Sequence, residues 1–314
     1  MMATWQDHLR KLAIAGGIAG AALGISLAGC SEKPAPGNAK VEVGPNVGEQ
    51  GGAGTPQTGT GENSVEADVN FNQTFEQAAI TEVLEGHQFP PDVTLGGKKS
   101  GPLRVEIESS WSKVKLVDSS AKPIRYTLQL DTSLGAIEIK LRPEIAPNHV
   151  RNIIALTHAG YYDGLQFERV IHQQSEIDGQ KTRLDMVLAG CPTGTGDDGL
   201  GHIGYFLRSE FQQNLKHEEG TVGFWHEENP DSAGCRFYIT LGPAPLLDGK
   251  FTIIGSVSKG LDVVKKIAEQ PLQSADVPPE NEKPVTPTGI KKAIIVPEAM
   301  EKTVPVAQNE RSGN

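Results

Sequence analysis

The chain has 314 residues, of which 37% are hydrophobic and 22% are charged. Its 29 Lys and Arg against 39 Asp and Glu give a formal net charge of −10, which argues against the basic surface of a nucleic-acid-binding protein. The length would allow two average domains, but Gly and Pro are concentrated before residue 66. One folded domain with an accessory segment is therefore the better prediction.

The N-terminus has the features of an export signal. Arg10 and Lys11 precede an apolar run that ends in Leu27-Ala28-Gly29-Cys30. A basic region, an apolar core and small residues before a cleavage point are typical of secretion. The ending resembles the bacterial lipobox, and this resemblance implies that residues 1–30 are a lipoprotein signal peptide and that Cys30 is acylated.

An uncleaved membrane anchor is the alternative interpretation of the same run, although it is shorter than the ~20 residues that a span usually needs. Both interpretations place residues 31 onward outside the cytoplasm. The lipoprotein interpretation predicts a protein that is lipid-anchored to the bacterial cell envelope on its periplasmic face.

Residues 31–67 are rich in Gly, Pro, Thr, Asn and Glu and have hardly any large apolar side chains. Such a composition cannot offset the entropy of ordering and predicts a flexible tether. Residues 299–314 are expected to form a disordered tail.

Residues 68–122 are predicted to form an accessory segment that packs on the main domain. Apolar residues at helical spacing predict a helix over Asn70–Glu85, which Gly86 can end. Alternation within Leu103–Val117 predicts one or two strands.

Residues 123–298 are predicted to form the main domain. Period-two alternation over residues 126–131 and 137–141, across a Ser133-Leu134-Gly135 turn, predicts a hairpin with one buried face. Helical spacing predicts one helix from Pro147 to Gly160 and another after Gly260. The remaining apolar runs are short and bounded by turns, which is typical of a closed antiparallel barrel.

Five blocks of this domain stand out in order along the chain: Leu165–His172, Gly190–Gly196, Gly220–Val222, Cys235–Ile239 and Leu247–Lys250. Read together, they resemble the cyclophilins, which are peptidyl-prolyl cis-trans isomerases. The resemblance extends from about Ile124 to Pro297. It implies a mainly β fold, a closed eight-stranded antiparallel barrel capped by two helices, to which the N-terminal accessory segment is added.

The resemblance also implies a reaction that needs neither a nucleophile nor a metal. Rotation about an X-Pro bond faces a barrier of about 18–20 kcal/mol, and an enzyme must favour the twisted amide. In cyclophilins a guanidinium near the prolyl nitrogen does this above an apolar proline pocket, and the matching residue here is Arg169. The alternative is an ordinary barrel arginine paired to a carboxylate.

Carried over position by position, the resemblance predicts eight substrate-binding residues: Phe167, Met186, Leu188, Phe237, Tyr238, Leu246, Leu247 and Phe251. Several depart from the family pattern. Leu188 replaces a glutamine, Phe251 a histidine and Leu246 the usual tryptophan, while Asp185 stands where the pocket phenylalanine is expected. A polar insert, His172–Leu184, precedes the pocket methionine Met186.

Three other patterns are interpreted as having no catalytic role. Gly194–Gly199 fits Gly-x-Gly-x-x-Gly, but the next residues, Leu200–Gly204, cannot open a helix, which argues against a nucleotide site. His217-Glu218-Glu219 and His226-Glu227-Glu228 lack a second histidine at zinc-protease spacing and are interpreted as solvated loop charges. No metal and no cofactor are therefore expected.

Two cysteines remain after Cys30, namely Cys191 in the glycine-rich loop and Cys235 before the Phe-Tyr pair. In the family these segments flank one secondary pocket, and export permits oxidation. The resemblance therefore implies a Cys191–Cys235 disulfide, with two free buried thiols as the alternative.

These observations predict a monomeric peptidyl-prolyl cis-trans isomerase that acts on proline-containing polypeptides among exported or envelope proteins. Because polar pocket positions are substituted, we expect reduced activity. A non-catalytic cyclophilin-like module that binds peptides or proteins is the alternative, and a purely structural envelope lipoprotein is the third. The expected partners of the isomerase are proline-containing polypeptides and, through the lipid anchor, the membrane. No nucleic-acid partner is expected.

Overall fold

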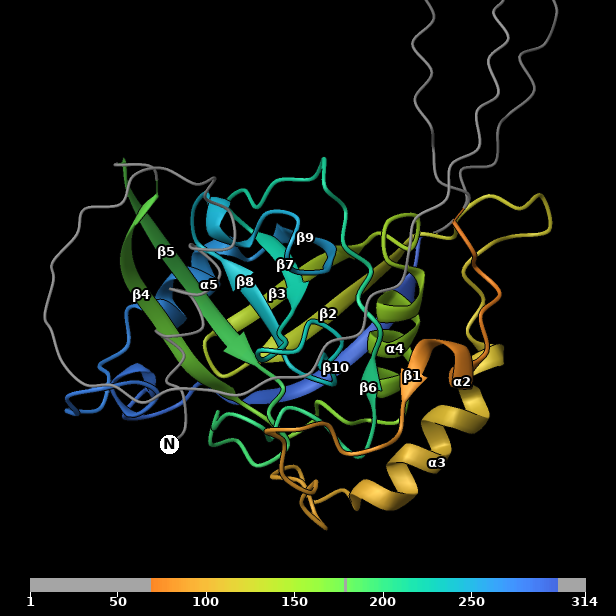
Figure 1. Cartoon of the computed structure of the whole chain (residues 1–314), viewed down its shortest axis with the longest axis horizontal. Coiled ribbons are helices and arrows are strands. Elements are labelled where there is room, and N and C mark those ends of the chain that lie inside the picture. The colour runs from red at the N-terminus through yellow and green to blue at the C-terminus, as the bar shows by residue number, and fades with distance from the viewer. Residues whose placement is uncertain (1–68, 178–179, 299–314) are drawn as a thin grey trace, which may run out of the picture. The chain divides into compact units, whose positions relative to one another are not determined.

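The computed structural model describes residues 69–177 and 180–298. The predicted signal peptide, tether and tail, residues 1–30, 31–67 and 299–314, lie outside the described residues. Among the residues that are described, no helix is long and apolar enough to cross a membrane. One large sheet dominates the structure, with helices packed against it (Figure 1).

The main sheet has eight strands, and all neighbouring strands are antiparallel. In spatial order they are β10 (Ile290–Pro297), β2 (Tyr126–Thr132), β3 (Gly135–Leu141), β9 (Ile253–Lys259), β7 (Thr221–Phe224), β8 (Phe237–Thr240), β5 (Gln180–Ala189) and β4 (Phe167–Ile177). The predicted mainly β, eight-stranded antiparallel fold is therefore confirmed.

The hairpin predicted from period-two alternation is the one formed by β2 and β3. Leu128 pairs with Ile139 and Leu130 with Ile137, and all four side chains are buried. Their alternation with polar residues puts one face of the hairpin into the core.

The two edges of the sheet meet through a few backbone hydrogen bonds. The Ile290 amide donates to the Leu165 carbonyl at 2.7 Å, and the Phe167 amide donates to the Thr288 carbonyl at 2.9 Å. No ladder joins β4 and β10 within residues 69–177 and 180–298. Closure of the predicted barrel is therefore local, at one end of the two edge strands.

Both helices predicted for the main domain are present. Helix α4 spans Pro147–His158, with the proline in its first turn, and packs along β10. Helix α5 spans Leu261–Ala268, buries Val264 and Ile267, and packs along β3.

The accessory segment differs from the prediction. The expected helix over Asn70–Glu85 is reduced to α2 (Phe75–Ala78), which is followed directly by β1 (Ala79–Ile80). A capping box at Thr74 starts the helix. It ends after one turn because the next residues pair with β6 (Phe206–Leu207), which is a tertiary contact that helical spacing cannot reveal.

The strands expected within Leu103–Val117 are also wrong. The structure has helix α3 (Ser100–Ser110), which continues into a 3-10 turn over Trp111–Lys113. Leu103, Ile107 and Trp111 are buried at a spacing of four, so one helical face packs inward. The apparent alternation came from Val105, which is 65% exposed on the opposite face.

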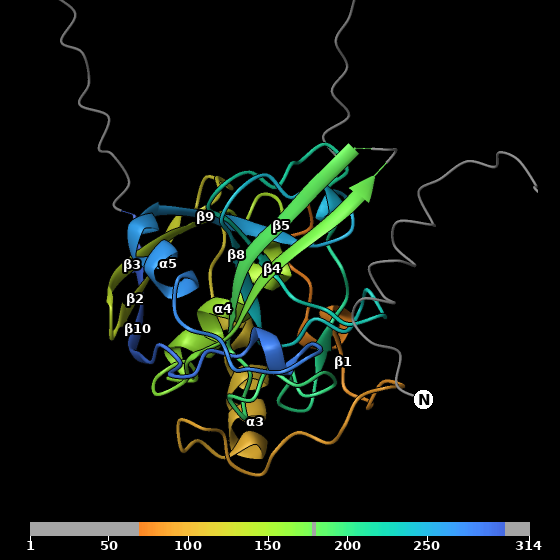
Figure 2. The ribbon, with the colours of Figure 1, turned by 90° about the vertical axis from the view of Figure 1, so that its left-hand side faces the viewer.

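The polar insert lengthens the hairpin of β4 and β5. Backbone pairing continues outward from the pair of His172 with Asp185 to the pair of Gln174 with Arg183 and beyond. Figure 2 shows the two strands extending together beyond the rest of the sheet. The insert is therefore a continuation of two strands.

His202 joins the accessory segment to the main domain. Its ring nitrogen Nε2 lies 2.9 Å from the Gln88 carbonyl, and its Nδ1 lies 3.1 Å from the Gly204 amide nitrogen. An Nε2–H tautomer satisfies both contacts, because Nδ1 then accepts from the amide. The ring is fully buried beside Phe206, at 4.3 Å between ring centroids.

We predict that Ile107→Ala destabilises the fold by about 2–5 kcal/mol, because it leaves a cavity under α3. Val105→Ala on the exposed face of the same helix is the matched control and should change stability by less than about 0.5 kcal/mol. Urea unfolding measures both. Equal effects of the two substitutions would contradict the orientation of α3.

We also predict that stability falls between pH 6.5 and pH 4. Burial lowers the pKa of His202 to about 4, below the value of about 6.5 in an unfolded chain. The unfolded state then binds more protons in this window, so folding loses on the order of 1–3 kcal/mol as the pH falls. His202→Gln should flatten this dependence, whereas exposed His158→Gln should not. Identical pH profiles for the two variants would refute the assignment.

Candidate active site

A β-bulge at Glu168 decides where the Arg169 side chain points. Phe167 pairs with Ala189 and Arg169 pairs with Leu188, so Glu168 is an extra residue in β4 that has no partner in β5. Because successive strand residues face opposite sides, the bulge turns Arg169 away from the face that carries Phe167.

Arg169 belongs to a row that crosses four neighbouring strands. It pairs with Leu188, which pairs with Tyr238, which pairs with Gly223. Directly paired residues of antiparallel strands point to the same face. A Cβ at Gly223 would lie 2.2 Å from the Tyr238 hydroxyl, so this glycine leaves room for the tyrosine ring.

The face that carries this row also carries a second buried apolar cluster. It brings together six of the predicted substrate-binding residues, each at most 3% exposed: Met186, Leu188, Tyr238, Leu246, Leu247 and Phe251. It is completed by Ile171, Leu184, Trp225 and Ala244. We refer to these ten residues as the apolar site cluster.

The other two predicted substrate-binding residues, Phe167 and Phe237, are not in this cluster. They lie in the main core, with ring centroids 6.3 Å apart. The structure therefore does not bring them to the face of Arg169. Phe167 and Phe237 are close in sequence to Arg169 and Tyr238, but their side chains point to the opposite face of the sheet, into the main core.

Asp185 also lies apart from the apolar site cluster. Its carboxylate is 2.6 Å from Nδ1 of His172 and 2.5 Å from Nε of Arg183. The aspartate that replaces the family's pocket phenylalanine is thus engaged with polar partners on the long hairpin.

The Arg169 side chain is fully buried and has carboxylates on two sides. Its Nε donates to Oε2 of Glu282 at 2.9 Å, and its Nη2 donates to the same oxygen. Its Nη1 donates to Oδ1 of Asp198 at 3.2 Å and to the Gly196 carbonyl at 3.4 Å. Burial raises the pKa of Glu282, although Arg169 acts in the opposite direction.

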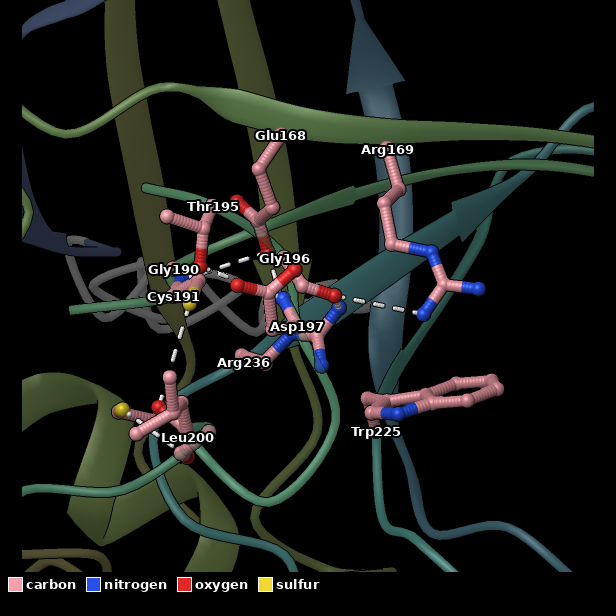
Figure 3. Close-up of polar contacts among 12 residues, drawn as sticks. Glu168, Arg169, Gly190, Cys191, Thr195, Gly196, Asp197, Leu200, Trp225 and Arg236 are labelled. Atoms are coloured by element: carbon pink, nitrogen blue, oxygen red, sulfur yellow. Dashed lines mark hydrogen bonds and ion pairs between the residues drawn. The ribbon is translucent and has the colours of Figure 1, made fainter. Parts of the chain in front are cut away.

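A second fully buried arginine, Arg236, lies close by (Figure 3). Its Nε donates to Oε1 of buried Glu168 at 3.1 Å, and its Nη1 donates to Glu227 at 3.4 Å. Burial alone would lower the pKa of Arg236, but the Glu168 carboxylate holds it above its ordinary value. Burial raises the pKa of Glu227 to about 7.

The glycine-rich loop approaches both arginines closely. The Gly196 carbonyl lies 3.4 Å from donors of Arg169 and of Arg236. A Cβ at Gly196 would lie 2.9 Å from the side chains of Arg169 and Glu168. The middle glycine of the Gly-x-Gly-x-x-Gly pattern is thus explained by the close packing of the loop backbone against the buried arginines.

The interpretation of His217 and His226 as solvated loop residues is wrong, because both are buried. Nδ1 of His217 lies 2.9 Å from Oδ1 of Asp248, and its Nε2 lies 2.8 Å from the Tyr238 hydroxyl. With the proton on Nδ1, the imidazole accepts from the tyrosine. The hydroxyl of Tyr238 is thereby satisfied within the apolar site cluster.

The predicted disulfide is also wrong, because Cys191 and Cys235 are free buried thiols. The Cys235 thiol donates to the Gly201 carbonyl at 3.1 Å, whereas Cys191 Sγ lies 3.1 Å from the Thr193 hydroxyl. Burial raises the pKa of the Cys235 thiol, so it is held in its protonated, unreactive form.

Within the described residues, no group of three or more His, Cys, Asp or Glu side chains is arranged to hold a metal ion. The acidic side chains near Arg169 and Arg236 instead compensate two buried positive charges. What the arrangement offers is a fixed guanidinium on the same face as an apolar cluster.

The sequence did not indicate the partners of Arg169. Glu282 lies in a polar, proline-containing segment between α5 and β10, 113 residues from Arg169. Asp198 lies in the glycine-rich loop, at a variable position of the Gly-x-Gly-x-x-Gly pattern. No local pattern marks either residue, since only the tertiary fold brings them to the guanidinium.

Comparison with known proteins identifies the family. Residues 127–294, more than half of the chain, match the family described as cyclophilin type peptidyl-prolyl cis-trans isomerase/CLD. The chain therefore belongs to the cyclophilin-type peptidyl-prolyl cis-trans isomerases, and its class is that of an enzyme.

Two fungal relatives illustrate the match. Peptidyl-prolyl cis-trans isomerase-like 1 of Rhizopus delemar is 38% identical over 143 residues, which are 46% of this chain and 80% of the relative. Peptidyl-prolyl cis-trans isomerase ppi1 of Schizosaccharomyces pombe is 36% identical over 168 residues, which are 53% of this chain and 97% of the relative. A crystal structure of a cyclophilin type isomerase from Cryptosporidium parvum has 24% identity and a TM-score of 0.46, covering 55% of this chain and 98% of that one.

Proposed function

We propose that this protein catalyses cis-trans isomerisation of X-Pro bonds in polypeptides, with Arg169 as the catalytic residue and the apolar site cluster as the proline site. The observation that carries the proposal is the bulge at Glu168, which puts the Arg169 guanidinium on the same face as Met186, Leu188 and Tyr238. These side chains and the guanidinium are buried, so a proline ring reaches them only when the site opens, and its amide then lies toward a fixed cation.

Such an arrangement acts on the barrier of the reaction. Twisting the amide removes its resonance and leaves the prolyl nitrogen with a lone pair that can accept a hydrogen bond. A donor that interacts more strongly with this state than with either planar state lowers the barrier. The apolar surroundings strengthen that interaction, because water screens it less.

We infer that the activity is reduced relative to a site with a complete set of polar contacts. Leu188 and Phe251 are apolar where the family has a glutamine and a histidine, and both are buried in the apolar site cluster. Neither side chain can hydrogen-bond the substrate backbone. The loss of one preorganised donor commonly costs about 2.7–4 kcal/mol of transition-state stabilisation.

A non-catalytic peptide-binding module is the second candidate function. The observation that favours it is the pairing of Arg169 with both Glu282 and Asp198, since two carboxylates offset the positive field of one guanidinium. Peptide binding without any gain in isomerisation rate would distinguish this candidate from the first.

We further propose that the protein is a bacterial lipoprotein that acts, as a monomer, on exported or envelope proteins. The support is the sequence Leu27-Ala28-Gly29-Cys30 after an apolar run with basic flanking residues. Residues 31–67 would then connect the isomerase domain to a lipid anchor at Cys30.

We predict that Arg169→Ala lowers kcat/KM for a short X-Pro peptide by roughly 100-fold or more, because it removes the donor to the prolyl nitrogen. Exchange NMR between the cis and trans peptide signals measures the rate, and circular dichroism checks the fold. Arg183→Ala, an exposed arginine on the long hairpin, is the control and should retain wild-type activity. An unchanged rate in Arg169→Ala would remove Arg169 from the mechanism.

Acylation is predicted at Cys30. Mass spectrometry of the full chain expressed in a bacterium and extracted from membranes should show an N-terminal cysteine that carries lipid. Cys30→Ser should release the protein into the soluble fraction or leave it unprocessed. A mature chain that still begins at Met1 would contradict the lipoprotein proposal.

A further inference from the structure

The residue directly across the β-ladder from Arg169 is apolar. It is Leu188, whose side chain can accept no hydrogen bond. An arginine side chain has many rotamers, and holding it in one orientation costs entropy that some contact must offset. Among the described residues, Glu282, Asp198 and Gly196 accept hydrogen bonds from this guanidinium, and all three lie outside the β4–β5 pair.

Glu282 supplies the most direct of these contacts. One oxygen, Oε2, accepts hydrogen bonds from both Nε and Nη2 of Arg169. Nε is the guanidinium nitrogen nearest the backbone, so this contact fixes the torsion of the last side-chain bonds. The glutamate is 8% exposed, which protects the pair from screening by water.

The backbone around Glu282 is itself fixed. The Glu282 amide donates to the Pro279 carbonyl at 3.1 Å, and the Gln273 amide donates to the Lys283 carbonyl at 2.8 Å. Nζ of Lys283 lies 2.6 Å from Oδ1 of Asp197 in the glycine-rich loop. The segment before β10 is thus clamped to the loop that approaches Arg169 from the other side.

Asp198 cannot replace Glu282 in this role. It contacts only Nη1, at 3.2 Å, and its side chain is 42% exposed. A single contact to the terminal nitrogen leaves rotation about the bonds nearer the backbone unrestrained. Asp198 therefore only compensates the positive charge of Arg169, whereas Glu282 compensates the charge and also fixes the orientation of the guanidinium.

We propose that Glu282 is the positioning residue for catalysis, the group that holds the Arg169 guanidinium over the apolar site cluster in place of a polar side chain on β5. This inference rests on the proposed role of Arg169. It predicts that the need for Glu282 disappears when position 188 carries a residue that can hold the guanidinium from across the ladder.

The test compares Glu282→Ala, Glu282→Gln and the double variant Glu282→Ala with Leu188→Gln in the full chain. In Glu282→Ala, kcat for a short X-Pro peptide should fall by roughly 10–100-fold while KM stays nearly constant. Glu282→Gln keeps an acceptor and should stay within about fivefold of wild type. Leu188→Gln should restore most of the loss, because glutamine at that position faces Arg169 directly.

Glu280→Ala is the matched control, because Glu280 lies in the same 3-10 turn with its side chain 51% exposed. It should leave kcat unchanged. A second readout, independent of turnover, is the exchange of the Arg169 Nε proton with water by 15N NMR. Exchange should be slow in wild type and in the rescued double variant and fast in Glu282→Ala.

The wild-type rate comes first and tests the proposed function alone. If wild type is active, an unchanged or raised kcat in Glu282→Ala would overturn the inference, and a raised value would mean that Glu282 restrains the enzyme. If Glu282→Ala does not fold, the decision passes to Glu282→Gln, where a loss of kcat with slow Nε proton exchange would equally overturn it.

Discussion

The site depends on the burial of two arginines, Arg169 and Arg236, neither of which is exposed. An uncompensated buried charge is strongly destabilising, so each must be met by carboxylates from elsewhere in the chain. Glu168, Asp198, Glu227 and Glu282 provide them from four separate segments. The requirement to compensate these charges ties the bulged strand β4, the glycine-rich loop and the segment before β10 into one structure.

The same requirement shapes the chemistry. The bulge directs Glu168 and Arg169 to different partners. Glu168 stabilises the fold through its ion pair with Arg236, whereas Arg169 faces the apolar site cluster. A cation next to apolar side chains is suited to a reaction whose barrier is the loss of amide resonance. The chain keeps the guanidinium beside the apolar cluster, while Leu188 and Phe251 are apolar where the family has polar side chains.

The sequence predicted the parts of the fold that depend on local periodicity. The hairpin of β2 and β3, helices α4 and α5 and the strand count all follow from alternation, helical spacing and the resemblance of five short blocks. The accessory segment was predicted incorrectly because its elements depend on tertiary contacts. Pairing of Ala79 with Leu207 ends α2, and burial of Ile107 and Trp111 on one face makes a helix of an apparently alternating stretch.

For the site, the sequence indicated Arg169 and most of the apolar residues, because their blocks resemble a known family. It could not show that Phe167 points into the main core, since a one-residue bulge in β4 reverses the facing of the strand. Phe237 faces the core because it directly precedes Tyr238 in β8, where successive side chains alternate without a bulge. It also missed Glu282, because no local signal connects a polar segment near the C-terminus with a strand more than one hundred residues earlier. Cys191 and Cys235 lie in neighbouring segments, yet each thiol has its own hydrogen-bond partner.

The most direct test of the account is exchange NMR on a short X-Pro peptide in the presence of a small amount of the full-length wild-type protein. Uncatalysed isomerisation takes tens to hundreds of seconds. If Arg169 and the apolar site cluster form a working active site, exchange peaks between the cis and trans signals should appear at mixing times below about one second, because binding of the twisted amide lowers the barrier. Peptide signals that shift on binding but show no exchange peaks at these times would contradict the assignment and would favour a binding module.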